Sequence, residues 1–502
     1  MSAAAVLERL FEAAVSQRLP STLRGLDGVF FAVFHDVIGA TTYIVTDRLG
    51  LRPIYIRADR DHLSWSSEAK GAAPASLSAS CLDLPAIVAY LTVGHHLDDA
   101  THLAGVRLAP AASIGIWRAG MEAPSWDRYW TWHEVEQQAH ATMHDAVDEL
   151  ARLWPRAVQR SVAAAGESLY LWLSGGFDSR LIAAEMARQG LRVHAITFGQ
   201  AGSTDLAVAR VVGAVLGIEV QALTLDDSTW FQNRASMLYK TDCASHVMHL
   251  HSGTHLHELG EHGDFFIEGF GGDFLLGDAQ HSGEEFRDRR ADAAVSEHYY
   301  RGLALDHADP YFDTPHIEPF ILHNRARRFT RAGGLAVSDQ SENVLPFVDG
   351  DLARFLMSLP DRLRASRSLY REFANRVYPE VFAELPHAKG RTIDGRDFTD
   401  KPVSVGGATV VIPSARVSLA DYEKLLRSPD VLALLGHHLA PGGSLLAALG
   451  HSHWRHFELW RDHTWMERER PSKHRQSREL MARALSFELW ATQLGLVDAS
   501  ET

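Results

Sequence analysis

Short runs of alternating apolar and polar residues fill the first part of the chain. Between residues 23 and 70 these runs read GVFFAVFHD, TTYIVTD, RPIYIRAD and HLSWSSE, and turn residues such as Gly39 separate them. Alternation with a period of two residues is typical of half-buried strands that pair with their neighbours. The pattern predicts a meander of antiparallel strands, then a helix over LPAIVAYLTVG and a strand pair around SIGIWRAG.

The pattern changes after residue 130. Apolar residues at helical spacing cover residues 133–165, and Gly166 closes this segment. Beyond it, helices ending at Gly190 and Gly217 are expected between strand-like apolar runs, which read SLYLWL, RVHAITF, EVQALTL and DFFIEGF. Strands that alternate with helices in this way form a parallel sheet covered on both faces. Past about residue 285 the chain is expected to be mostly helical, with one apolar interruption at ATVVIP.

Length and composition indicate a globular protein with more than one domain. The sequence has 502 residues, of which 46% are hydrophobic and 22% charged. No apolar run reaches the roughly 20 residues that span a bilayer, and the first residues carry Glu8 and Glu12 where a signal peptide would be basic. Two cysteines, Cys81 and Cys243, form no disulfide framework. We therefore expect a reduced, cytoplasmic protein that has no membrane partner.

Charge and histidine content narrow the candidate chemistry further. A formal net charge of −14 argues against nucleic acid as a partner, because phosphate backbones need a basic face. Six of the 28 histidines lie between His246 and His262, and His251 and His255 have the spacing of a metal-binding pair. No third ligand follows from the pattern, so we expect a packed segment there rather than a zinc site.

The stretch LWLSGGFDSR, at residues 171–180, carries the strongest chemical signal. The predicted strand ends at the carboxyl edge of the sheet, where open α/β folds bind ligands. Ser174, Gly175 and Gly176 then turn directly into a helix that begins near Asp178. Backbone N–H groups and the helix dipole converge at such a turn, which suits a phosphate or pyrophosphate. A glycine turn that is merely capped by Asp178 is the alternative interpretation.

Side chains of the same turn add to this prediction. The hydroxyls of Ser174 and Ser179 are further donors for an anion. Asp178 would repel a phosphate, but it suits Mg²⁺, which bridges carboxylate and phosphate oxygens. The turn therefore predicts a site for a metal–pyrophosphate pair.

SGGFDS resembles the pyrophosphate-binding loop of the ATP pyrophosphatase superfamily, whose members cleave ATP to AMP and pyrophosphate. That superfamily includes GMP synthetases, tRNA-modifying enzymes and asparagine synthetases. LRGLDGVFFAVFHD, VTDRLGLRPIYI, LSWSSEAKG and THLAGVRLAPAASIGIW resemble, in order and spacing, the second half of the asparagine synthetase glutaminase domain. TFGQAGSTDLAVARVVGAVLGIEV, IEGFGGDFLLG and VLPFVDGDLARFLMSLPDRLR are similar to the same family's synthetase half. The resemblance implies an α/β protein with a truncated, glutaminase-like antiparallel domain over 1–130 and a parallel-sheet synthetase domain with a helical C-terminal part over 131–502.

The sequence departs from that family where the family hydrolyses glutamine. Asparagine synthetases carry a cysteine nucleophile directly after the initiator methionine, and here Ser2 stands at that position. Neither Cys81 nor Cys243 is an N-terminal nucleophile, whose free α-amine serves as its own base. We therefore expect the first domain to be a scaffold without a nucleophile, and the reacting amine to belong to a substrate.

A second departure concerns the loop that reads GFGGDFLLG, where Phe270 and Phe274 replace acidic residues of the family. This apolar variant resembles β-lactam synthetases, which close an amide within one molecule. Those enzymes have a tyrosine at the position that aligns with Phe347, which has no hydroxyl to relay a proton. A small-molecule amide or β-lactam synthetase is one alternative, although Phe347 counts against it, and a catalytically inactive binding module is another.

The lasso-peptide cyclases, or macrolactam synthetases, are the branch of this family that fits the whole pattern. The resemblance implies that ATP adenylates an Asp or Glu side chain of a precursor peptide, and that the peptide's own N-terminal amine attacks it. It further implies ATP and Mg²⁺ as cofactors, the precursor peptide as substrate and a leader-processing protein as partner.

The resemblance also assigns roles to individual residues. Asp178 and Asp273 are the expected metal ligands, Lys389 the catalytic cation for the intermediate, and Glu380 a weaker candidate general base. Adenine is expected near the strand ends at Leu173 and Phe198. The expected nucleotide-binding residues are Leu173, Ser174, Gly175, Gly176, Asp178, Ser179, Phe198, Gly269, Gly271 and Gly272.

Overall fold

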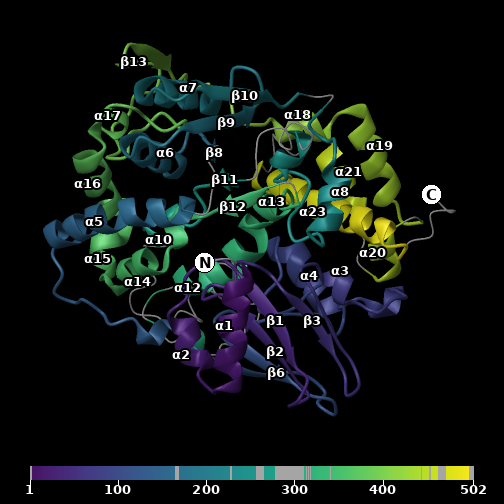
Figure 1. Ribbon diagram of the computed structural model, residues 1–502. Helices are drawn as coiled ribbons and strands as arrows, with labels where there is room; N and C mark the ends of the chain where they lie inside the picture. Colours follow the sequence, from purple (N-terminus) through teal and green to yellow (C-terminus); the bar gives the residue numbers. More distant parts are fainter. Residues whose placement is uncertain are drawn as a thin grey trace.

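A computed structural model describes most of the chain, as two stacked regions with further helices beside them (Figure 1). The first region consists of antiparallel sheets, and the second is built on a parallel sheet. The described residues are 3–163, 169–226, 229–255, 265–276, 310–312, 314, 316, 318–339, 341–415, 417–442, 444–450, 454–461 and 471–496.

Two antiparallel sheets form the first domain. One has the strand order β1-β2-β6-β7 and the other the order β4-β3-β5. The predicted meander is therefore correct in its strands and wrong in its connectivity, because β2 pairs with β6 and not with β3. The strands are β1 (Phe31–Asp36), β2 (Thr41–Thr46), β3 (Tyr55–Ala58), β4 (Leu63–Ser66), β5 (Arg107–Leu108), β6 (Ser113–Trp117) and β7 (Ser125–Arg128).

Helices flank these sheets. The predicted helix over LPAIVAYLTVG is α4 (Leu84–Val93), where the Asp83 side chain caps the first turn and Gly94 ends the helix with φ of 90°. The segment predicted to be helical from residue 133 begins later, because Thr142 caps α5 (Met143–Val162) and only a short turn precedes it. Gly166, its expected end, lies outside the described residues. The other helices here are α1 (Ala3–Val15), α2 (Leu19–Arg24) and α3 (Ala69–Ala72).

The parallel sheet has the strand order β10-β9-β8-β11-β12, and all neighbouring strands run parallel. Its first four strands in the chain are the predicted ones. The fifth, β12, comes from the segment ENV, which the apolar pattern did not single out. The strands are β8 (Leu169–Trp172), β9 (Val193–Gly199), β10 (Val220–Thr224), β11 (Phe265–Ile267) and β12 (Glu342–Val344).

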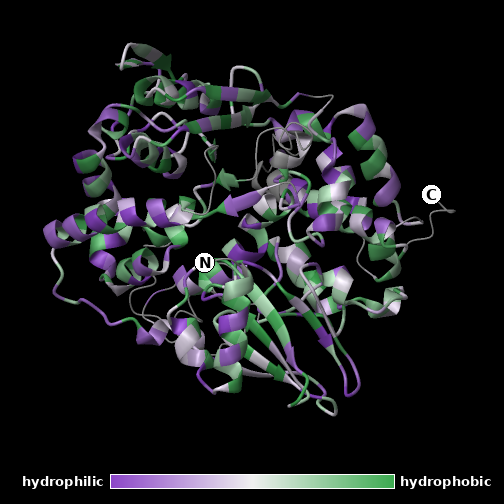
Figure 2. Ribbon diagram, viewed as in Figure 1, coloured by the Kyte–Doolittle hydropathy of each residue, from purple (hydrophilic) through white to green (hydrophobic). Residues whose placement is uncertain are grey.

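The two faces of this sheet are covered differently. Leu171, Ala195 and Ile267 belong to the large core that also holds buried residues of α5, α6 (Asp178–Arg188) and α7 (Thr204–Leu216). The opposite face is aromatic, with the rings of Trp172 and Phe266 stacked 4.9 Å apart. In Figure 2 the strand β11 is green, whereas β12 at the edge of the sheet is largely purple. The alternation of side chains along each strand thus fills two separate apolar layers.

The C-terminal part is mostly helical, as expected. The apolar interruption ATVVIP is one strand of a hairpin formed by β13 (Pro402–Val405) and β14 (Ala408–Val411). No helix within the described ranges is both long and apolar enough to cross a lipid bilayer. The principal helices are α8 (Arg234–Lys240), α10 (Gly272–Leu275), α13 (Ala332–Leu335), α14 (Gly350–Ser358), α15 (Asp361–Arg364), α16 (Ser368–Val377), α17 (Pro379–Phe382), α18 (Tyr422–Leu426), α19 (Pro429–His438), α20 (Leu445–Ala448), α21 (Trp454–Arg461) and α23 (Pro471–Gln493).

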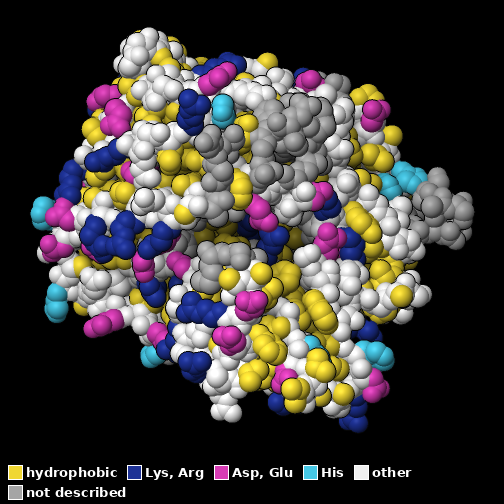
Figure 3. All heavy atoms as spheres, in the orientation of Figure 1, with side chains coloured by type: hydrophobic (Ala, Val, Ile, Leu, Met, Phe, Trp, Pro, Cys, Tyr) yellow, Lys and Arg dark blue, Asp and Glu magenta, His cyan; other side chains and the backbone are white. Residues whose placement is uncertain are grey.

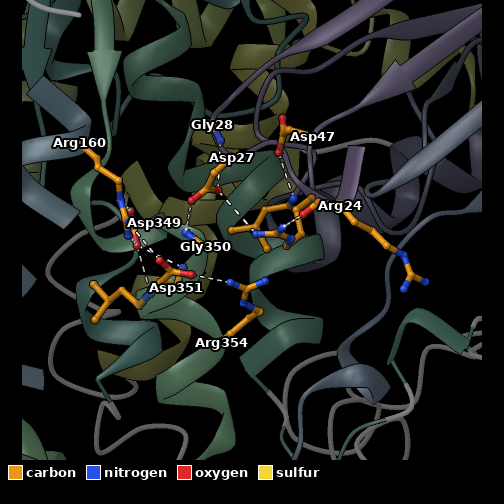
Figure 4. A network of polar contacts seen from close by, with 12 residues as sticks. Arg24, Asp27, Gly28, Asp47, Arg160, Asp349, Gly350, Asp351 and Arg354 are labelled. Carbon is orange, nitrogen blue, oxygen red and sulfur yellow. Dashed lines mark hydrogen bonds and ion pairs between the residues drawn. The ribbon is translucent and has the colours of Figure 1, made fainter. Parts of the chain in front are cut away.

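Polar contacts gather where the two domains meet, in a set that we call the domain seam, defined by Asp27, Arg48, Lys70, Arg160, Asp242, Asp349 and Gly350. The contacts of Asp27 with Gly350 and of Lys70 with Asp242 cross between the domains, whereas Arg160 and Asp349 pair within the second domain. The Asp27 carboxylate accepts a hydrogen bond from the Gly350 amide at 2.8 Å and lies 3.6 Å from the Arg48 guanidinium (Figure 4). Arg160 forks onto the buried Asp349. Over the face seen in Figure 3, acidic and basic side chains are interspersed in the same way. The charges of the seam are thus matched within the protein.

Candidate active site

The SGGFDS turn lies where the sequence predicted it, between the end of β8 and the start of α6. The Ser179 hydroxyl is buried and accepts a hydrogen bond from the Ser174 amide at 3.0 Å. The Ser174 hydroxyl lies 3.1 Å from that of Ser179 and accepts the Gly176 amide at 3.1 Å. These bonds close the turn on itself at the N-terminus of a helix, the geometry that suits an anion.

The loop at 269–273 follows β11, the strand next to β8 in the sheet, and it touches the turn directly. A Cβ atom at Gly272 would lie 2.6 Å from Cγ of Asp178, and one at Gly269 would lie 2.9 Å from Cβ of Asp178. Gly271 has φ of 93°, a conformation that side chains other than glycine rarely adopt. All three predicted glycines are therefore required by close approach or by backbone conformation. They bring Asp178 against the residue that precedes Asp273.

A third segment, at 386–390, closes the other side of the turn. The Ala388 amide donates to the carbonyl of Gly175 at 3.0 Å, and a Cβ at Gly175 would lie 2.7 Å from Cβ of Ala388. Lys389 is exposed next to this contact, and its charge acts on the carboxylate of Asp205 at the start of α7. We call the three segments at 174–179, 269–273 and 386–390 the nucleotide corner. The predicted Lys389 thus lies beside the predicted turn, although about 210 residues separate them in the chain.

Arg180 ties the third segment to the turn. Its guanidinium is fully buried and donates to the carbonyls of Val381 at 3.1 Å, Leu385 at 2.8 Å and Pro386 at 3.0 Å. Burial lowers its pKa to about 9, so the group still carries its charge at neutral pH. Arg180 therefore both fixes the backbone that leads to Lys389 and places a positive charge beneath the turn.

Asp178 receives a hydrogen bond from a residue that the sequence did not single out. The hydroxyl of Tyr370, on α16, donates to Oδ1 of Asp178 at 3.1 Å. Burial, and then the charge of Asp178, hold the pKa of Tyr370 well above its ordinary value. The hydroxyl therefore stays protonated and acts as a donor.

Asp205 is a second residue that the predictions missed. The backbone amide of Gly175 hydrogen-bonds to its carboxylate. Burial raises the pKa of Asp205, while the Gly175 amide and the charge of Lys389 oppose that rise. Asp205 lies inside TFGQAGSTDLAVA, one of the segments that carried the resemblance, and this position could have marked it as a candidate site residue. Nothing local in the sequence marked Tyr370.

The donor set of the corner fits Mg²⁺. Asp178 packs on Gly272, and Asp273 is the next residue, so two carboxylates come from adjoining loops. Carboxylate oxygens together with phosphate oxygens are the ligands that Mg²⁺ prefers. Within the part of the chain that the structure describes, no group of three His, Cys, Asp or Glu side chains is arranged to hold a metal without such help. The remaining ligands would have to come from a nucleotide and water.

The expected adenine residues lie on adjacent strand ends. The Leu173 amide donates to the carbonyl of Ile196 at 2.9 Å, next to the strand that carries Phe198. Their side chains belong to different layers, since Leu173 is in the large core and Phe198 packs on Trp172 across the sheet. The adenine position stays a prediction.

Glu380 and the histidines lie apart from these bonds. Glu380 is exposed in the first turn of α17. His251 contacts Phe198 and pairs with the Tyr422 hydroxyl at 2.6 Å, and His246 packs on His249. His257 and His262 lie outside the described residues. The side chains of His246, His249 and His251 are thus packed, consistent with the expectation from the sequence.

Two parts of the chain match known protein families. Residues 7–130 match a model described as a glutamine amidotransferase domain, and residues 149–304 match one described as asparagine synthase. The chain thus contains a glutamine amidotransferase-like domain followed by an asparagine synthase-like domain. None of the curated proteins matches it.

The asparagine synthase match supports ATP-dependent amide bond formation in general. The match at 149–304 contains two of the three segments of the nucleotide corner. Members of the matched family use ATP, usually with Mg²⁺, and this agrees with the two carboxylates, Asp178 and Asp273, described above. The family alone does not select a substrate.

Proposed function

We propose that this protein closes an amide bond within a precursor peptide, as lasso-peptide cyclases do. ATP would adenylate an Asp or Glu side chain of the peptide, and the peptide's own N-terminal amine would attack it. The observation that supports this most directly is the contact of Asp178 with the glycine loop at 269–272, beside the exposed Lys389. That contact unites an anion-binding turn, two carboxylates and a cation at one sheet edge.

The proposed chemistry has two balanced steps. A carboxylate oxygen attacks the α-phosphorus of ATP, a P–O bond forms, and pyrophosphate leaves. The amine nitrogen then attacks the acyl carbon, a C–N bond forms, and AMP leaves while one proton is released. Activation is needed because a carboxylate is a poor electrophile, and the bound peptide supplies its amine at high effective concentration.

Each segment of the corner has a role in this proposal. The turn at 174–179 would hold pyrophosphate oxygens through amides and hydroxyls. Asp178 and Asp273 would bind Mg²⁺, which when bound neutralises the phosphate charge. Lys389 would stabilise the negative charge of the tetrahedral intermediate and of departing AMP. Arg180 would keep Lys389 in place through the backbone of 381–386.

The source of the amine supports an intramolecular reaction. Both cysteines of the sequence are internal, so neither has the free α-amine that an N-terminal nucleophile uses as its base. Cys243 is fully buried, and burial raises the pKa of its thiol to about 12. Neither cysteine therefore fits the role of an N-terminal nucleophile for glutamine, and we propose that the amine arrives on the substrate peptide itself.

Phe347 distinguishes the proposal from β-lactam formation. Its ring is fully buried, stacks on Trp154 at 4.6 Å and lies against Gly271. The position thus borders the nucleotide corner but offers no hydroxyl for a proton relay. We therefore favour a peptide substrate over a small β-amino acid, and a leader-processing protein is the partner that we propose to prepare it.

The test is to incubate the protein with ATP, Mg²⁺ and either a precursor peptide or a small amino acid substrate. We expect AMP, pyrophosphate and a peptide lighter by one water. Asp178→Ala should reduce AMP formation by at least about 1,000-fold, because it removes a metal ligand. Asp148→Ala, which changes an exposed side chain of α5, is the matched control and should keep full activity.

Two results would contradict the proposal. Full AMP formation by Asp178→Ala would overturn the metal assignment. If the protein formed product from the small substrate but from no peptide, the proposal of a peptide cyclase would be replaced by that of a small-molecule synthetase.

A further inference from the structure

Two tyrosines, one on α16 and one directly after it, form hydrogen bonds to α6 at two positions along that helix. Tyr370, on α16, donates to Asp178 at the first residue of α6, and Tyr378 donates to Glu185 farther along α6. Asp178 and Glu185 are seven residues apart, which is about two turns, or roughly 10 Å along the helix. Both tyrosine rings are buried, with 2% and 1% of their surfaces exposed. The two bonds are alike in chemistry, but only one of them reaches the nucleotide corner.

Glycine contacts fix the base of the Asp178 side chain and leave its carboxylate group to be oriented. The Cβ atom of Asp178 is wedged beside Gly269, and Gly272 closes over its carboxyl carbon. The final torsion of an aspartate is broad, so packing at Cβ does not by itself set the direction of the oxygens. The Tyr370 hydroxyl, 3.1 Å from Oδ1, supplies one constraint on that direction.

We propose that Tyr370 is a positioning residue, whose hydroxyl turns the Asp178 carboxylate toward the metal–pyrophosphate site. The inference rests on the proposed function for the identity of the metal ligand. A neutral hydroxyl suits this role because it holds one oxygen without cancelling the charge of the carboxylate. The ring is itself held rigidly, since α16 packs on α5 and the ring contacts Phe382 at 6.2 Å between centroids. Hydrogen bonds of this kind to metal ligands change metal affinity by about 10–100-fold.

Tyr378 provides the matched control. Tyr370→Phe and Tyr378→Phe each remove one buried hydroxyl that bonds to a carboxylate of α6. Glu185 also accepts a hydrogen bond from Gln189 at 2.6 Å, and it lies about two helical turns along α6 from Asp178. A purely structural role would therefore make the two variants alike in every measurement.

The experiment measures metal binding directly. Mn²⁺, a paramagnetic substitute for Mg²⁺, is titrated into each protein in the presence of α,β-methylene ATP, and free Mn²⁺ is followed by electron paramagnetic resonance. We expect Tyr370→Phe to weaken Mn²⁺ binding by about tenfold, and Tyr378→Phe to leave it unchanged. Urea unfolding of both variants checks that their loss of stability is comparable.

The outcomes separate this inference from the proposed function. Unchanged Mn²⁺ affinity in Tyr370→Phe, or an equal loss in both variants, would overturn the positioning role. Absence of any Mn²⁺ binding to the wild type with the nucleotide analogue would overturn it as well. If the wild type forms no product from any peptide, the proposed function fails, while the tenfold difference in Mn²⁺ binding would still establish the role of Tyr370.

Discussion

The domain seam and the nucleotide corner both contain several carboxylates, but the groups that bond to them differ. In the seam, Asp349 receives the Arg160 guanidinium and Asp242 lies 3.5 Å from the Lys70 ammonium. In the corner, Asp178 accepts a hydrogen bond from a tyrosine hydroxyl and Asp205 accepts one from a backbone amide, which acts on Asp205 more strongly than the charge of Lys389 does. Cationic partners neutralise a carboxylate, whereas neutral donors only orient it.

This difference indicates what each set of carboxylates is for. A carboxylate that is neutralised inside the protein holds two segments together. A carboxylate that is oriented by a neutral donor keeps negative charge, which a metal ion can use. Substitutions in the corner should therefore change activity more than stability, and substitutions in the seam should do the reverse.

Among the substitutions that test this comparison, the largest effect is expected from Gly272→Ala in the corner. Because the new methyl group would lie 2.6 Å from Cγ of Asp178, the carboxylate has to move. A displacement of this kind should lower the rate of pyrophosphate formation by about 100-fold, measured with saturating ATP. Gly333→Ala, in α13, is the control, since a Cβ there meets nothing within 4 Å and should leave the rate unchanged. Equal rates for both variants would show that the close approach does not matter.

The second largest effect is expected from Asp242 of the seam, whose ionisation should make the stability of the protein depend on pH. Burial raises its pKa to about 6, against the opposing charge of Lys70. Because the folded-state pKa lies above the ordinary value of 3.8, its contribution to stability is complete below that value and is lost as the pH rises through about 6. We expect the free energy of unfolding of the wild type, relative to Asp242→Asn, to fall by about 3 kcal/mol between pH 4 and pH 7.

Urea unfolding over that pH range measures the change. Asp339→Asn, at an exposed partner of Lys240, is the control and should follow the wild-type profile. If the free energy of unfolding of Asp242→Asn changed with pH in parallel with that of the wild type, Asp242 would be as accessible to water as Asp339.

The smallest effect is expected from Asp349→Ala. Its buried carboxylate accepts Arg160 and also caps α14 through the amides of Asp351 and Leu352. Arg160 is 40% exposed, so screening reduces the value of the pair, and we expect a loss of about 2 kcal/mol. Asp351→Ala removes an exposed partner of the same arginine and should cost no more than about 0.5 kcal/mol. Thermal unfolding compares the two, and AMP formation should survive in both.

The sequence predicted the parallel sheet better than the antiparallel ones. SLYLWL is a nearly continuous apolar run because both faces of its strand are covered, and such a run stands out, whereas RVHAITF and EVQALTL mix apolar with polar residues. β12 was missed because ENV has only one apolar residue of its three and lies at the sheet edge. The meander was joined wrongly because local alternation predicts strands and not their partners. β2 reaches β6 across about 70 residues, a pairing that depends on tertiary packing.

The same limit applies to the nucleotide corner. The turn at 174–179 could be predicted because its chemistry is contiguous, and Gly269–Asp273 because its glycines are spaced like those of a known family. Tyr370 is 192 residues from Asp178, and its hydroxyl arrives there only because of how α16 lies on α5. Arg180 looked like an ordinary helix residue, although its guanidinium bonds to carbonyls about 200 residues away. Interactions formed between elements leave no local pattern to find.

The order β10-β9-β8-β11-β12 has a consequence beyond stability. The chain winds outward from β8 to one edge of the sheet and then returns to add β11 on the other side, so its winding direction reverses between these two strands. An open sheet leaves a crevice at such a reversal. The location of the binding place is therefore a property of the chain's path. New loop residues can re-line that crevice for a different acid or amine without moving it.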